Sequence, residues 1–343
     1  MVFMMIQQFT NTICCNQILT FMIMRNLVCL LLFIPIISCN NNKEHIAKRK
    51  STDFPHQLHI NSESKELDRI INIDNWVLTD SQIVCKSSGT DDFFYTIDNH
   101  TLIIKDSFAN KGGGPEEYIM PHIIPNTSNS YLIADVSKKE IQLWEDGNIK
   151  KRMSTPVMTM NDPQIWKYPL MGYTENFPNA LIWKMVNIEN GVVCDSLLFD
   201  DPQKEGKAII NDFAYRFHNN KFVLLHYQLD KLMIADINLD NRLENKILFE
   251  GDTPTSEESI LYSDLACTDN FIYLLSQKKV NIEEQSGLST IEVYNYEGRP
   301  VCLIELDMIA SSFLIDIRNN RMLFLSPLDE KIHFISWNEE KAN

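Results

Sequence analysis

Residues 130–147 read SYLIADVSKKEIQLWEDG, and this stretch decides the fold of the chain. It contains two short apolar segments separated by a polar turn, and the second ends in an aromatic residue, two acidic residues and a glycine. The same arrangement returns within residues 270–298, as NFIYLL and IEVYNYEG. Shorter copies occupy residues 220–236 and 320–335. Alternating apolar runs bounded by Asn, Asp, Gly and Ser predict β-hairpins.

The hairpins recur at a regular interval. Equivalent strands are expected near Phe94, Ile141, Cys194, Met233, Ile291 and Ile332. Their mean spacing is about 48 residues, and periods of roughly 40 to 50 residues are typical of four-stranded propeller blades. The sequence therefore predicts an all-β protein with a six-bladed β-propeller. A β-sandwich or two β domains would show similar alternation without needing this repeat, and they remain the alternative.

Composition and charge narrow the classes of partner that the chain is expected to bind. The chain has 343 residues, of which 44% are hydrophobic and 22% are charged. That apolar content is enough for a sizeable core. The 46 acidic and 31 basic residues give a formal charge of −15. This charge opposes binding to phosphate backbones, so no nucleic-acid partner is expected.

The amino-terminal region has the layout of an export signal. Residues 24–39 read MRNLVCLLLFIPIISC, in which Arg25 precedes an apolar core that ends in Ser38 and Cys39. The core is shorter than the roughly 20 residues of a spanning helix, which favours a secretory signal. Its ending resembles the lipobox of bacterial lipoproteins, and the resemblance implies that Cys39 is lipidated and begins the mature protein. Residues 1–38 are then the signal region, with translation starting at Met24.

The polar residues after Cys39 predict a flexible tether. Residues 39–65 are assigned to this lipidated tether and residues 66–343 to the propeller. Deletion of residues 40–60 is accordingly expected to leave folding nearly intact. The last blade offers only three strand-like runs, so the apolar run from Leu67 to Ile73 is expected to supply its fourth strand and close the ring.

A glycine-rich segment, FANKGGGPEEY at residues 108–118, carries a family resemblance. The segment is similar to one in the TolB-like six-bladed β-propeller lipoproteins of Bacteroidota, and several later strands resemble NHL-like blades. The resemblance implies the fold and an envelope location, on the periplasmic or surface side of the membrane, but no activity. The segment lacks the Gly-Lys-Ser/Thr ending of a phosphate-binding loop. It is interpreted as a structural clasp, with a ligand loop as the alternative, formed by Gly112, Gly113, Gly114, Pro115, Glu116 and Glu117.

A second candidate is an aromatic stretch between residues 161 and 178. A contact loop there would stack on sugars or peptides, although ordinary packing is the simpler interpretation. Its aromatic residues are Trp166, Tyr168, Tyr173 and Phe177.

The sequence contains few signs of catalysis or metal binding. There is no CxxC pair and no Gly-x-Ser-x-Gly motif, and the run from Asp236 to Asn241 lacks the glycine of a calcium loop. No catalytic residue, metal or cofactor is therefore predicted. The expected function is a non-catalytic binding or scaffold module, anchored at the envelope, with a protein or glycan partner. A metal-dependent, lactonase-like hydrolase with its site in the central channel is the alternative.

The mature chain has four cysteines besides Cys39, and each lies in an apolar run. Two disulfides are possible in an oxidising compartment, but buried free thiols are the simpler expectation. These residues are Cys85, Cys194, Cys267 and Cys302.

Overall fold

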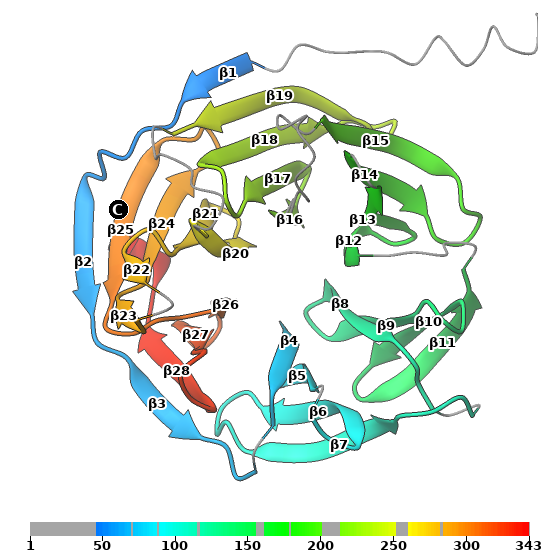
Figure 1. The fold of residues 1–343 in the computed structure, drawn as a ribbon. Helices are drawn as coiled ribbons and strands as arrows, with labels where there is room; N and C mark the ends of the chain where they lie inside the picture. Colours follow the sequence, from blue (N-terminus) through cyan, green and yellow to red (C-terminus); the bar gives the residue numbers. More distant parts are fainter. Residues whose placement is uncertain are drawn as a thin grey trace, which may run out of the picture. The chain divides into compact units, whose positions relative to one another are not determined.

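The computed structural model describes residues 46–69, 71–87, 89–114, 117–155, 161–177, 180–200, 213–251, 260–281 and 284–342. Six antiparallel sheets stand in a ring around a central axis, which confirms the predicted six-bladed β-propeller (Figure 1). The signal region and Cys39 lie outside the described residues, as do Pro115 and Glu116.

Each blade begins with its innermost strand and continues outward along the chain. Blade 1 contains β4 (Ile73–Leu78), β5 (Gln82–Ser87), β6 (Asp92–Asp98) and β7 (Ile104–Asn110). Blade 2 contains β8 (Pro121–Thr127), β9 (Ser130–Asp135), β10 (Glu140–Glu145) and β11 (Asn148–Ser154). Blade 3 contains β12 (Asn161–Lys167), β13 (Leu170–Phe177), β14 (Ala180–Asn187) and β15 (Val193–Asp200).

The second half of the ring has the same order. Blade 4 contains β16 (Phe213–His218), β17 (Lys221–His226), β18 (Lys231–Ile237) and β19 (Leu243–Glu250). Blade 5 contains β20 (Tyr262–Cys267), β21 (Phe271–Ser276), β24 (Thr290–Asn295) and β25 (Pro300–Leu306), with a small hairpin of β22 (Val280–Asn281) and β23 (Ser286–Gly287). Blade 6 contains β26 (Ser312–Asp316), β27 (Arg321–Leu325) and β28 (Lys331–Ser336), and the 3₁₀ turn η2 (Glu339–Ala342) follows.

The inner strands begin on one face of the ring, which we name the A face, and end on the other, the B face. In each blade the turn between the second and third strands therefore lies on the A face. The turn between the third and fourth strands lies on the B face.

The core lies between the blades. Six apolar clusters are found among the described residues, and each is shared by two neighbouring blades. The second strands are covered on both faces: all six residues of β9 are buried, as are all six of β21. Because burying one large apolar side chain contributes roughly 1.5 to 3 kcal/mol, interlocking of neighbours is the main stabilising force.

The expectation of a flexible tether over residues 39–65 is wrong from Ile46 onward. Three strands form there: β1 (Ile46–Arg49), β2 (His56–Ile60) and β3 (Glu63–Glu66). β1 pairs in parallel with β19, the outer strand of blade 4, and β2 pairs in parallel with β25 of blade 5. We name residues 46–66 the belt, because they follow the outside of three successive blades (Figure 1). The polar composition of the belt concealed these strands, since backbone pairing needs no apolar side chains.

The belt also closes the ring, but through a different segment from the one expected. β3 pairs antiparallel with β28 and supplies the fourth strand of blade 6. The predicted donor, Leu67 to Ile73, lies just downstream: Ile71 is buried between blades 6 and 1, and Ile73 opens β4. All four residues of β3 are exposed, so apolar patterning could not identify it.

A buried ionic cluster fixes the belt between blades 4 and 5. The Lys50 side chain is fully buried, and its Nζ donates to Asp230 Oδ1 at 2.9 Å and to Glu292 Oε2 at 3.0 Å. Lys278 Nζ binds the same two carboxylates at 3.2 and 3.0 Å. The Tyr262 hydroxyl also contacts Lys50 and donates to Asp230 at 2.7 Å. Two ammonium groups therefore balance two carboxylates, and Lys50 is supplied by the belt.

The four described cysteines are free thiols. Cys85 and Cys302 are buried, and burial raises the pKa of the Cys85 thiol to about 12. Cys194 lies in the fourth strand of blade 3, whereas its predicted equivalents lie in third strands, so the repeat was assigned one strand too late in this blade. No helix among the described residues is long and apolar enough to cross a membrane.

Candidate functional site

A cavity of about 340 Å³ lies in the central channel, lined by the inner strands. Asp74 comes from β4, His122 from β8, Gln164 from β12, Arg216 from β16 and Asp264 from β20. Five blades thus each contribute a polar group to one space. The repeated fold brings these residues together although they are far apart in the sequence.

Asp264 holds the wall of the channel together. Asp264 is buried, and its Oδ1 accepts a hydrogen bond from Arg216 Nη2 at 3.0 Å. Its Oδ2 accepts from the Phe313 N–H of blade 6 at 3.0 Å. Burial raises the pKa of Asp264 above its ordinary value, although Arg216 and two backbone N–H groups oppose the rise. The carboxylate therefore links blades 4, 5 and 6 and positions the Arg216 guanidinium at the channel.

Burial favours the neutral form of the His122 imidazole. Its pKa is lowered by burial and by the nearby charge of Lys86, while Asp135 acts in the opposite direction. A neutral imidazole carries one donor and one acceptor nitrogen. His122 therefore offers the channel neutral hydrogen-bonding capacity.

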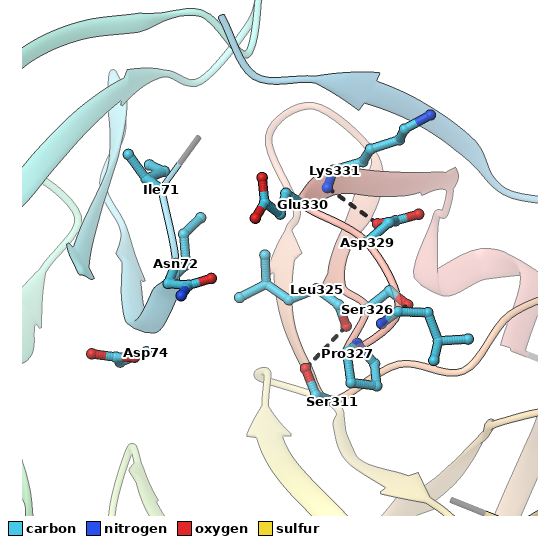
Figure 2. A pocket seen from close by; sticks show the side chains of 12 residues that line it. Ile71, Asn72, Asp74, Ser311, Leu325, Ser326, Pro327, Asp329, Glu330 and Lys331 are labelled. Carbon is cyan, nitrogen blue, oxygen red and sulfur yellow. Dashed lines mark hydrogen bonds between the residues drawn. The ribbon is translucent and has the colours of Figure 1, made fainter. Parts of the chain in front are cut away.

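A second cavity, of about 430 Å³, lies between the segment leading into β4 and the β27–β28 loop of blade 6. Figure 2 shows Asn72 and Leu325 on opposite sides of this space. Lys331 points away from it, and the Lys331 Nζ pairs with Glu66 of the belt at 3.1 Å. The Ser311 hydroxyl donates to the Leu325 carbonyl at 3.2 Å and fixes one edge.

The two cavities adjoin each other, and we name them together the A-face recess. They share four lining residues: Ile73, Asp74, Ser311 and Leu325. Carboxylates predominate in the lining, and they belong to Asp74, Asp162, Asp264, Asp329 and Glu330. Arg216 is held by one of these carboxylates and Lys331 is turned outward, so the recess is polar and acidic in balance.

The glycine-rich segment lies between blades 1 and 2, outside the residues that line the recess. Glu117 folds back on the turn: its carboxylate accepts the Gly114 N–H at 2.7 Å, and its own N–H donates to the Gly114 carbonyl at 3.2 Å. Lys138 donates to the carbonyls of Gly114 and Glu117. These contacts belong to an internally bonded turn. Gly112 has a positive φ of 153°, and a Cβ there would lie 2.0 Å from the Glu117 carboxylate.

Most of the aromatic stretch forms β12 and β13 of blade 3, and Tyr168 lies in the turn between these strands. Trp166 donates its indole N–H to the Asn219 carbonyl at 2.8 Å, and Tyr173 is buried. The Tyr168 hydroxyl donates to Glu189 at 2.7 Å. The side chain of Phe177 lies outside the described residues. The three described aromatic residues therefore pack against their own neighbours.

The residues of the recess were missed from the sequence. One weak signal was present: several inner strands begin with a polar residue at their second position, as at Asp74, His122 and Asp162. A signal of this kind is only visible once the blades are aligned. Among the described residues, no group of three His, Cys, Asp or Glu side chains is placed to hold a metal ion.

Comparison with solved structures shows the fold. An exported-protein candidate from Bacteroides fragilis NCTC 9343 is 9% identical and aligns over 81% of this chain and 98% of its own, with a TM-score of 0.51. A member of the DUF4221 family from Bacteroides vulgatus ATCC 8482 is 10% identical over 81% and 98% of the two chains, with a TM-score of 0.49. The Cps50 (Swd1) β-propeller domain of Myceliophteria thermophila is 10% identical over 81% and 100%, with a TM-score of 0.44. No protein-family model and no curated protein matches the chain.

Proposed function

We propose that this protein is an envelope lipoprotein, anchored through Cys39, whose propeller binds a ligand in the A-face recess without transforming it. The ligand is an extended protein or glycan segment that is polar or positively charged. The observation that carries this proposal is that two cavities adjoin on the A face, where both are lined by Ile73, Asp74, Ser311 and Leu325.

The shape and charge of the recess support this ligand class. A recess that runs from the channel to the groove between blades 6 and 1 suits an elongated ligand better than a small globular one. Its carboxylates attract amines and guanidinium groups, and its Ser, Asn and backbone groups suit hydroxyls and amides. The overall charge of −15 adds to the attraction for positively charged partners.

The proposed envelope location is supported by the signal layout of residues 24–39. It is also supported by the similarity of the fold to an exported-protein candidate of Bacteroides fragilis. Mass spectrometry of the membrane fraction tests it directly. A mature chain that begins with acylated Cys39 is expected, and an unmodified terminus upstream of Cys39 would contradict it.

Binding is tested with arrays of short peptides and glycans, followed by fluorescence anisotropy on the best ligands. The double variant Asp74→Asn, Glu330→Gln should weaken binding about fivefold or more, which corresponds to about 1 kcal/mol. Added salt should weaken binding by the wild type more than binding by the variant, because charge attraction is screened.

Asp240→Asn is the matched control, since this exposed carboxylate lies in a B-face turn and its loss changes the net charge without touching the recess. Equal binding by the double variant and the wild type would refute the proposed site. Stoichiometric calcium or zinc in the purified protein would instead favour the hydrolase alternative.

A further inference from the structure

Two neighbouring turns on the B face expose large aliphatic side chains. The β14–β15 turn exposes Val192 (57%) and the adjoining Val193 (48%), and the β18–β19 turn exposes Leu239 completely. We name these three residues the aliphatic tip. Exposing large aliphatic side chains at turns is unfavourable in water, so a tip of this kind indicates a contact surface.

The two turns are fixed next to each other. The Leu243 N–H at the start of β19 donates to Asp195 Oδ2 of β15 at 2.7 Å. The turn that carries Leu239 is closed tightly, because Asn238 Oδ1 accepts the N–H groups of both Asp240 and Arg242 at 3.0 Å. The aliphatic tip is therefore preformed.

The belt begins at the end of blade 4 that carries this tip. β1 runs parallel to β19 with Ile46 opposite Ile247, so β1 begins at the end of blade 4 where β19 starts. From Ile247 back to Leu243 is about 13 Å along the strand. The six residues between Cys39 and Ile46 allow a span of at most about 25 Å. A lipid on Cys39 is thus held within reach of the aliphatic tip.

We propose that the aliphatic tip inserts into the interface of the membrane that holds the Cys39 lipid. This inference rests on the lipid anchor of the proposed function. The tip lies on the B face, so its insertion leaves the A-face recess directed away from the bilayer and open to ligands. The belt makes this orientation possible, because it replaces most of a long tether with strands fixed to blades 4, 5 and 6.

The chemistry of the tip favours a lipid surface over a charged partner. Val192, Val193 and Leu239 contribute only hydrocarbon, and the net charge of −15 opposes attraction to anionic lipids. Insertion must therefore be apolar and must not require anionic lipids.

The test uses the full chain purified from its own membranes and reconstituted into phosphatidylcholine vesicles. A polarity-sensitive fluorophore is attached at Leu239→Cys in a Cys194→Ser background, which removes a partly exposed thiol. The control is Ile317→Cys, an exposed aliphatic position (57%) that also lies in a B-face turn, but on blade 6. The label at position 239 should shift to the blue and be quenched severalfold by brominated lipids, while the label at 317 should remain as in water.

A second variant separates insertion from anchoring. The double substitution Val192→Asp, Val193→Asp should abolish the shift at position 239 while the protein still floats with the vesicles. Identical, water-like labels at 239 and 317 in floating protein would overturn the inference and leave the lipid anchor standing. Failure of the protein to float would overturn both. A shift at 239 that appears without vesicles and grows with protein concentration would show a contact between copies instead.

Discussion

The strongest stability prediction concerns Lys50, which joins the belt to the ring. Lys50→Met removes an ammonium group that is 2.9 Å from Asp230 and 3.0 Å from Glu292, at a site closed to solvent. Two buried carboxylates would then share the single charge of Lys278. Removing one partner of a buried ion pair typically costs about 3 to 5 kcal/mol. We expect a loss of that size, measured by urea unfolding.

The pH dependence of stability gives a second test of this prediction, because it depends on the pKa of Glu292. Burial acts to raise this pKa, but the charges of Lys50 and Lys278 outweigh it and hold the pKa below its ordinary value. The wild-type pair therefore stabilises the fold above the unfolded pKa of Glu292, and this contribution is lost as pH falls through the lower folded pKa. In Lys50→Met the pKa of Glu292 should rise, so this contribution should shrink.

Two variants make the reasoning refutable. Lys48→Met alters an exposed lysine in β1, two residues before Lys50, and should cost less than about 1 kcal/mol. The double variant Lys50→Met, Glu292→Gln restores the charge balance and should be more stable than the sum of the single changes, by about 1 kcal/mol or more. Equal losses for Lys48→Met and Lys50→Met would refute the role given to the cluster.

His226 is buried, and burial together with the charge of Lys231 lowers its pKa from 6.5 to about 4. The neutral form of His226 therefore contributes stability above pH 6.5, and this contribution is lost as the pH falls through 4. The loss approaches about 3 kcal/mol; urea unfolding at pH 7 and pH 4 should show it for wild type and much less for His226→Gln, and parallel pH profiles would contradict it. Gly112→Ala should lower the melting temperature and Gly113→Ala should not. A Cβ at position 112 would meet the Glu117 carboxylate, whereas a Cβ at position 113 would meet nothing within 4 Å. Equal melting temperatures for the two variants would contradict this prediction. Deleting residues 46–60 should destabilise the ring sharply while deleting 40–45 should not, by calorimetry, and similar melting of both would show that the belt is dispensable.

The ring could be predicted because its blades repeat an apolar pattern. Strands such as β9 and β21 are buried on both faces, so their hydrophobic runs are visible without any structure. Blade 3 was misaligned at Cys194 because its third strand, β14, has a weaker match to the repeated hairpin. A strand that is buried on both faces therefore produces an apolar run that can be recognised in the sequence.

The belt and the recess have much weaker sequence patterns. The β3 strand, ESKE, is held by backbone pairing and is exposed throughout, so it resembles a tether. In the sequence, Lys50 is one cation of a basic run. Only the fold shows that it pairs with Asp230 and Glu292, which lie 180 and 242 positions further along the chain. The recess depends in the same way on residues from several blades. Contacts between distant polar residues cannot be read from local patterning.

The central claim is that the A-face recess holds the ligand, and site-directed photocrosslinking in cells tests it most directly. A photoreactive phenylalanine analogue is placed at Leu328, which lines the recess and is 49% exposed, and in a control protein at Ile317 on the B face. We predict a discrete adduct from position 328 whose yield falls severalfold in the Asp74→Asn, Glu330→Gln variant, and no such adduct from position 317. An adduct whose yield is unchanged in the double variant, or that forms only from position 317, would contradict the claim.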